Sequence, residues 1–184
     1  MAGSNGKQKT VRDMILSLGL IGIAAAIVYI FIPHSDHAPD VKRVDYRVEL
    51  LTARRAAPYP VAAPEGLAKS WKATSVSYDG AAFDAWHLGF SAPGGQYVQI
   101  EQSTQKPADF VDTASQGGTA TKTTQNIDGH TWTRYTGGRY DALVLTAKGS
   151  TTVVAGTGSF DQLTEMAKAL RTKQPDRDDV DRQS

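Results

Sequence analysis

The sequence predicts an α+β domain that follows one N-terminal membrane-spanning helix, and three observations lead to this prediction. Residues Met14–Ile32 form an uncharged apolar run. Between Trp71 and Ala155, short segments of alternating apolar and polar residues are separated by turns that contain glycine. Two segments with helical signals, Ala108–Ser115 and 159–170, follow some of these strands. Antiparallel strands with interposed helices are typical of the α+β class, so we expect one antiparallel sheet of about seven to eight strands and two helices.

The run Met14–Ile32 has the length of a transmembrane helix. Its nineteen residues reach about 28 Å at about 1.5 Å per residue, close to the hydrocarbon thickness of a bilayer. Eleven of them are Leu, Ile, Val or Phe, which favour insertion. A cleaved signal peptide is the alternative, but signal h-regions are shorter, and Asp36 and Pro39 make a poor cleavage site around Ala38. We therefore predict an uncleaved anchor.

Basic residues predict the orientation of this anchor. Lys7, Lys9 and Arg12 precede it, whereas no Lys or Arg lies in residues 34–40. Because cytoplasmic flanks carry the excess of positive charge, we predict a cytoplasmic N-terminus and a C-terminal domain outside the cell membrane. The predicted parts are a cytoplasmic tail (1–13), the transmembrane helix (14–32), a linker (33–42), an extracytoplasmic α+β domain (43–173) and a disordered tail (174–184).

Two small residues in the anchor, Gly22 and Ala26, have the spacing that lets membrane helices pack closely. A homodimer through this face is one interpretation. The other is that the membrane merely tolerates small residues at these positions.

Composition and the linker argue against a metal, a cofactor or a nucleic acid. The chain has no cysteine, which excludes disulfides and thiol chemistry. Its formal net charge of +1 does not provide the basic surface that nucleic acids require. The linker contains four residues of metal-binding type, but two prolines deny them a helix, and we predict no metal site there; the four are His34, Asp36, His37 and Asp40.

The elements of the domain are predicted from their patterns in chain order. Val44–Leu50 alternates apolar and charged residues, which favours a strand over a helix continuing from the membrane. The Asp79-Gly80 dipeptide is typical of a tight type I′ hairpin. Pro107 suits the first turn of the helix Ala108–Ser115. After an irregular crossing, the predicted strands are 71–78, 83–91, 96–102, 119–127, 130–135, 140–147 and 151–155.

Three elements have an expected place in the fold. Thr119–Ile127 is polar on both faces, which predicts an edge strand. Leu143–Leu145 is a consecutive apolar run, as expected for a central strand covered on both faces. Ser159 and Gln162 form a capping box that starts the last helix, whose apolar stripe extends to Leu170.

A repeated sequence pattern predicts two β-β-β-α halves. Phe83–Leu88 and Tyr140–Leu145 share the pattern aromatic-Asp-Ala-x-x-Leu, and each copy is followed by a glycine turn, a strand and a helix. A duplicated unit explains this pattern, and so does the chance recurrence of ordinary hairpin signals.

Candidate catalytic residues are few. Ser103 and Lys106 have the S-x-x-K spacing of serine acyl enzymes, but a proline follows at once and no partner motif is present. Gly156–Ser159 precedes a helix, as an anion-binding loop would, yet it lacks the P-loop lysine, and we predict ordinary capping. His87 and His130 are the histidines of the folded part, and we expect each to be structural.

Several motifs occur together: Tyr59-Pro60-Val61-x-x-Pro64-x-Gly66-Leu67, Trp71, Trp86-His87-Leu88-Gly89-Phe90, Tyr97-Val98, Glu101-Gln102-Ser103 and Thr131-Trp132-x-Arg134-Tyr135. With them the chain resembles a family of single-pass membrane proteins from high-GC Gram-positive bacteria, domain of unknown function 4245. The resemblance implies a helical anchor and an exported domain, and it supplies no catalytic or binding residues. The start of the domain also resembles sandwich domains of the PsbP type, in fold alone.

We predict a membrane-anchored, non-catalytic binding or interaction module of the cell envelope, whose partner is an envelope protein or a cell-wall ligand. Aromatic residues supply the surface for such binding. We expect Trp71 and Trp86 in the core. For Trp132 two roles stay open, a core residue and a residue that lines a ligand groove. Two alternatives are a small envelope hydrolase that uses His87 or His130, and a structural or assembly factor that acts through its membrane helix.

Overall fold

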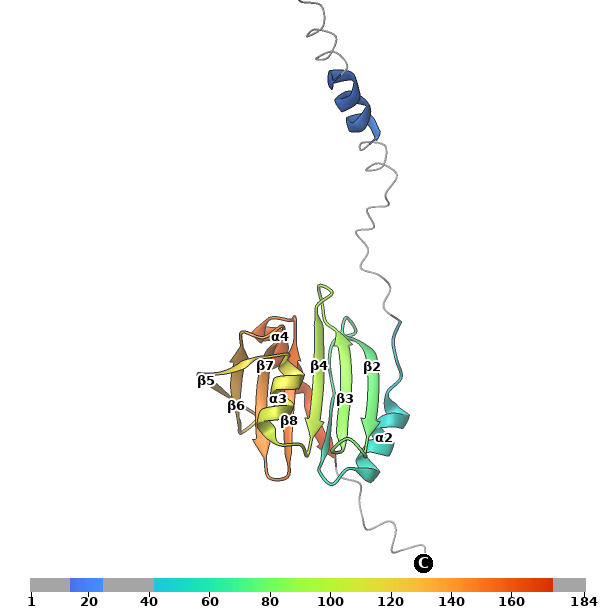
Figure 1. Ribbon diagram of the computed structural model, residues 1–184. Coiled ribbons are helices and arrows are strands. Elements are labelled where there is room, and N and C mark those ends of the chain that lie inside the picture. Colours follow the sequence, from blue (N-terminus) through green and yellow to red (C-terminus); the bar gives the residue numbers. More distant parts are fainter. Residues whose placement is uncertain (1–13, 25–41, 174–184) are drawn as a thin grey trace, which may run out of the picture. The chain divides into compact units, whose positions relative to one another are not determined.

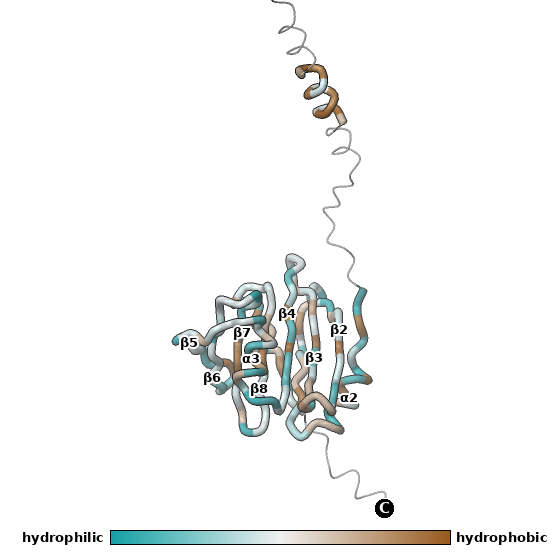
Figure 2. The backbone as a smooth tube through the Cα atoms, in the orientation of Figure 1, coloured by the Kyte–Doolittle hydropathy of each residue, from teal (hydrophilic) through white to brown (hydrophobic). Residues whose placement is uncertain are grey.

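The computed structural model describes residues 14–24 and 42–173, and the chain divides into two compact units, residues 1–38 and 39–184 (Figure 1). The first unit contains a helix over residues 14–24, which is mostly hydrophobic (Figure 2). The rest of the predicted span, residues 25–32, lies outside the described residues, as do Ala26 and the histidines of the linker. Within the described ranges, no helix has both the length and the apolar character to cross a membrane.

The second unit is built on a seven-stranded antiparallel sheet in the order β2-β3-β4-β8-β7-β6-β5. A separate antiparallel pair joins β1 to β9. The predicted α+β class with one large antiparallel sheet is confirmed. The strands are β1 (Val61–Pro64), β2 (Lys72–Asp79), β3 (Ala85–Ser91), β4 (Tyr97–Ser103), β5 (Thr119–Ile127), β6 (His130–Thr136), β7 (Asp141–Ala147), β8 (Ser150–Gly156) and β9 (Leu170–Lys173).

Helices α3 (Pro107–Ser115) and α4 (Phe160–Ala169) cover opposite faces of this sheet. The α3 face is a small core that contains Val144, with Phe110, Val111, Ala114, Ala142, Val153 and Ala155. The α4 face belongs to the main core, which contains Leu143 and Val154 together with Leu163 and Met166. Successive residues of β7 therefore enter different cores, which confirms that it is a strand covered on both faces.

The predicted strand Val44–Leu50 is wrong, because part of it forms helix α2 (Arg47–Ala56). The Asp45 carboxylate accepts a hydrogen bond of 3.0 Å from the backbone N–H of Arg47 and so holds the start of the helix. Its apolar positions at helical spacing pack into the main core: Tyr46, Leu50 and Ala53. A strand would have buried Val48 with Leu50, but Val48 is 76% exposed.

The two Asp-Gly dipeptides give different turns. Asp128-Gly129 makes the tight two-residue turn, since Ile127 pairs directly with His130 and both turn residues have positive φ. Asp79-Gly80 was expected to do the same, and this prediction is wrong: Asp79 pairs with Ala85 across a longer loop. The Asp79 carboxylate accepts the backbone N–H groups of Ala81 and Ala82, which stabilises the wider turn.

The two halves predicted from the repeated sequence pattern agree with the strand order but not with the positions of the helices. Each proposed half contributes three sequential strands, β2-β3-β4 and β6-β7-β8, and the halves meet where β4 pairs with β8. If the two halves were duplicates, a two-fold axis perpendicular to the sheet would relate them, because β4 and β8 are antiparallel neighbours. Such an axis would place both helices on the same face of the sheet. Here α3 and α4 lie on opposite faces. Duplication and the PsbP likeness both stay predictions.

Candidate functional site

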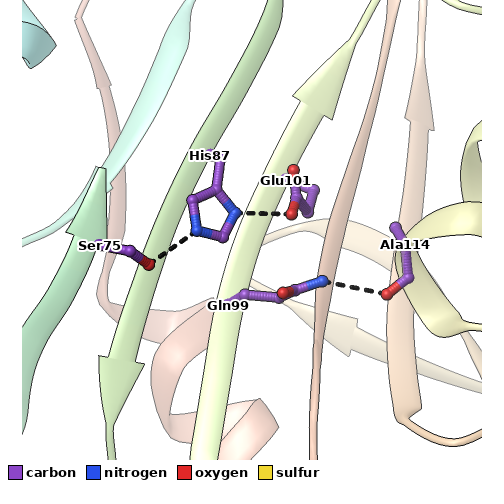
Figure 3. Close-up of polar contacts among 5 residues, drawn as sticks. All are labelled: Ser75, His87, Gln99, Glu101 and Ala114. Carbon is purple, nitrogen blue, oxygen red and sulfur yellow. Dashed lines mark hydrogen bonds and ion pairs between the residues drawn. The ribbon is translucent and has the colours of Figure 1, made fainter. Parts of the chain in front are cut away.

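Three neighbouring strands carry a row of hydrogen-bonded polar side chains across one face of the sheet. His87 on β3 is its centre: its Nε2 lies 2.8 Å from Ser75 Oγ on β2, and its Nδ1 lies 2.7 Å from Glu101 Oε1 on β4 (Figure 3). We call Ser75, His87 and Glu101 the polar row. The side chains of His87 and Glu101 are 25% and 18% exposed, so a molecule in solution can reach the row.

The strand register brings these residues together. His87 lies directly opposite Glu101 on β4, and its partner on β2 is Ser77. Ser75 is one position further along the same face, opposite Gly89. Side chains at diagonal positions of an antiparallel pair are within reach of a long or aromatic group, and the imidazole of His87 spans this gap.

Gly89 provides the space in which Ser75 and Tyr97 meet. A Cβ atom at residue 89 would lie 2.7 Å from the Tyr97 hydroxyl oxygen and closer still to Ser75 Oγ. Any side chain larger than glycine would therefore displace both hydroxyl groups. Burial raises the pKa of the Tyr97 phenol, and the neighbouring Ser75 hydroxyl partly offsets this rise. Tyr97 thus keeps its proton and remains a donor at neutral pH.

The hydrogen bonds of the row dictate where its protons lie. A carboxylate can only accept, so Nδ1 of His87 donates to Glu101 when that group is ionised. In the neutral imidazole the other nitrogen is then an acceptor, and Ser75 Oγ–H donates to Nε2. A hydroxyl aimed at an imidazole that a carboxylate orients is the arrangement of a nucleophile, a base and a positioning group.

Helix α3 leaves this part of the sheet open. It packs on β7 and β8, and Figure 1 shows it in front of these strands and beside β4. Gln99 holds the end of the helix there: its buried amide donates a hydrogen bond of 3.0 Å to the carbonyl oxygen of Ala114 (Figure 3). The polar row therefore lies on an accessible surface beside a fixed helix end.

A second candidate site is a cleft on the opposite face of the sheet, with a volume of about 380 Å³. We call it the Trp132 cleft. Its apolar lining comes from Ala62, Ile127, Trp132, Leu145, Ala167 and Leu170. Its polar lining comes from Asp128, His130, Thr152, Arg171 and Thr172. An apolar floor with a few polar groups is the usual composition of a small-molecule site, and the volume lies within the usual range of roughly 300–1,000 Å³.

The charged rim of the Trp132 cleft is fixed by Arg171. One guanidinium nitrogen, Nη1, lies 3.8 Å from Asp128 Oδ2 and also donates to the backbone carbonyls of Lys168 and Leu170. His130 is exposed beside this pair, whereas Trp132 is 3% exposed and forms part of the floor. Trp132 thus serves as a core residue and as part of the floor of the cleft.

Residues 7–170 match the model of one protein family, described as "Protein of unknown function (DUF4245)". The chain belongs to the DUF4245 family. No curated protein matches it. The matched region of this DUF4245 chain includes the whole polar row and all of the Trp132 cleft except Arg171 and Thr172.

The other residues singled out in the DUF4245 sequence have structural roles. Ser103 is buried and donates to the backbone oxygen of Phe83, and no described contact joins it to Lys106. Ser159 and Gln162 form the predicted capping box at the start of α4. Among the described residues, no cluster of three or more His, Asp or Glu side chains could hold a metal ion.

Two residues of the polar row were missed in the sequence, Ser75 and Glu101. Both are ordinary surface residues of their strands until β2, β3 and β4 are placed side by side. The signal that could have found them is the alternation in β3, which sends His87 to the face opposite Trp86. Once His87 faces outward, polar residues at matching positions of the neighbouring strands become candidates for its partners.

Proposed function

We propose that the DUF4245 chain is a single-pass membrane protein whose extracytoplasmic domain binds a small amphipathic ligand of the cell envelope in the Trp132 cleft. The cleft carries this proposal, because it combines an apolar floor with hydrogen-bonding groups at one side. A suitable ligand has an apolar part that packs on Trp132 and Leu145, and a polar end that reaches His130, Thr152 and Arg171.

The charges at the rim limit the chemistry of the polar end. Asp128 and Arg171 already form an ion pair at 3.8 Å, and both side chains are well exposed, so the pair contributes little binding energy of its own. His130 and Thr152 supply hydrogen-bond donors and acceptors. These groups favour a ligand end with hydroxyl, amide or sugar oxygens over one with a strong charge.

The membrane anchor rests on the sequence of residues 7–32. Its support is the uncharged nineteen-residue run and the three basic residues before it. A reporter fused to the C-terminus, with readouts on both sides of the membrane, tests this part. We expect activity outside the cell and none in the cytoplasm. An inward-facing C-terminus would overturn the envelope assignment.

Ligand binding is tested with the ¹⁵N-labelled domain, residues 42–173, which contains both described cores. It is titrated with soluble cell-wall fragments and with envelope glycolipids in micelles, and amide shifts are recorded. We expect shifts confined to the Trp132 cleft and abolished by Thr172→Trp, since Thr172 is exposed and lines the cleft. Thr123→Trp, at an exposed position of β5, is the matched control and should bind as the unmodified domain does.

A role in assembly through the membrane helix is the competing function, and the apolar run is the observation that favours it. Exchange of residues 14–32 for an unrelated membrane span separates the two hypotheses. The cleft proposal predicts that function survives this exchange and is lost in Thr172→Trp. The assembly role predicts the reverse.

A further inference from the structure

The polar row lies on the opposite face of the sheet from the Trp132 cleft, and the cleft proposal does not account for it. Trp86 and Leu88 enter the main core beneath the cleft, so His87 between them points to the α3 face. Both ring nitrogens of His87 are engaged, at 2.8 and 2.7 Å, by a hydroxyl and a carboxylate.

We propose that Ser75, His87 and Glu101 form a second site that transfers and hydrolyses small acyl groups, with Ser75 as the nucleophile. The order hydroxyl, imidazole, carboxylate and the two short distances are what this chemistry requires. The row is partly exposed, and no helix of the described residues packs over it, so an ester or amide carbonyl can approach Ser75 Oγ from solvent.

The reaction balances with water as the second substrate. Ser75 Oγ attacks the acyl carbon while its proton passes to His87 Nε2. The bond to the leaving group then breaks, and the leaving oxygen or nitrogen takes that proton from His87. A water molecule repeats the sequence: its oxygen bonds to the acyl carbon, His87 accepts its proton, and Ser75 Oγ leaves and recovers the proton. Glu101 acts as a positioning residue, because it holds Nδ1–H and stabilises the imidazolium that forms.

The Tyr97 hydroxyl is the donor nearest to the developing negative charge. It converges with Ser75 Oγ on the space above Gly89. Strand β3 lies between β2 and β4, so its backbone N–H groups around the row are committed to the sheet and offer little to an oxyanion. Because Tyr97 is a single side-chain donor where acyl-transfer sites use two or more donors, the site suits activated esters with good leaving groups rather than peptides.

The test is mass-spectrometric mapping of the full-length chain in detergent after treatment with a fluorophosphonate, together with the release of p-nitrophenol from p-nitrophenyl acetate. We expect a single covalent adduct on Ser75. Ser75→Ala and His87→Ala should lose both the adduct and the ester turnover. Ser77→Ala, at an exposed position on the same face of β2, is the matched control that should keep both.

Further variants separate catalysis from structure. Tyr97→Phe keeps the ring and should lower the rate of ester turnover roughly a hundredfold. Glu101→Gln should lower the rate and change its pH profile, whereas a purely structural role would leave the profile unchanged. Absence of an adduct on Ser75 in the unmodified chain overturns the proposal without any variant. Equal turnover by Ser75→Ala also overturns it, and neither result bears on the Trp132 cleft.

Discussion

The indole Nε1 of Trp86 donates a hydrogen bond of 3.0 Å to the carbonyl oxygen of Ala62 and so joins the large sheet to the two-stranded one. The backbone N–H of Ala62 donates to Gln102 Oε1 at 2.7 Å. Two fully or nearly fully buried side chains of the seven-stranded sheet therefore hold both backbone groups of one residue in β1. This attachment positions β1 and β9, which form one wall of the Trp132 cleft.

Gln102→Met should destabilise the domain by about 2–3 kcal/mol, because it leaves the buried N–H of Ala62 without an acceptor. The Gln102 amide also donates to Thr152 Oγ1 at 3.0 Å, so a second buried group loses its partner. Urea unfolding followed by circular dichroism measures the change. Gln99→Met is the control, since that amide donates one hydrogen bond among the described residues, to the carbonyl oxygen of Ala114, and its loss should cost about 1 kcal/mol. An equal cost for both would contradict the importance of the Ala62 attachment.

Gly156→Ala should be among the most destabilising single substitutions in the domain. A Cβ atom there would collide with the backbone carbonyl of Tyr97 across the central β4–β8 pair, and a backbone atom cannot swing aside. Overpacking of this kind costs about 1–3 kcal/mol or more. Gly80→Ala meets nothing closer than 3.6 Å and should be nearly neutral. Thermal unfolding of the two variants distinguishes them, and similar melting temperatures would show that β4 and β8 are less closely paired than described.

Ser159→Ala should lower stability by about 1 kcal/mol, because it removes the N-terminal cap of α4. The loss is local. Ser159 Oγ accepts a hydrogen bond from the backbone N–H of Gln162, and Gln162 Oε1 accepts one from the backbone N–H of Ser159. Urea midpoints give the measurement. Ser77→Ala, at an exposed strand position, should leave the midpoint unchanged. If both variants behave alike, the cap is not formed in solution.

The domain should lose stability as pH rises from about 10 to about 12. Burial, together with a 3.0 Å hydrogen bond to Asp84, raises the pKa of Tyr78 to about 12. An unfolded tyrosine ionises near pH 10. Between the two values the unfolded chain has released a proton that the folded protein retains, so unfolding becomes easier as pH rises. Tyr78→Phe should make this decline shallower in urea titrations, and an unchanged decline would contradict the contribution of Tyr78.

Local signals in the sequence predicted much of the fold correctly. The edge strand β5, the doubly covered strand β7 and the capped helix α4 follow from patterns within single segments. Two features depended on distant residues instead. Val44–Leu50 alternates like a strand, but Tyr46, Leu50 and Ala53 gain more burial as a helix against the main core. The short strands β1 and β9 exist because they pair with each other and with Trp86 and Gln102.

The candidate sites were predictable only in part. His87 and His130 stood out because histidines are rare in the domain, yet neither spacing nor composition links His87 to Ser75 or Glu101. Those contacts depend on the register of three strands. The Trp132 cleft likewise combines residues from β1, β5, β6, β7, β8, α4 and β9, which no local pattern brings together.

Ligand binding in the Trp132 cleft is tested most directly by photo-crosslinking in intact cells, with benzoylphenylalanine in place of His130 in the full-length chain. His130 is exposed and lines the cleft. We predict a reproducible adduct of defined mass on the outer side of the membrane, lost when Thr172→Trp is added. The same probe at Ser77, an exposed position on β2, should give no such adduct. Identical adducts from both positions, or none from residue 130, would contradict a ligand-binding cleft.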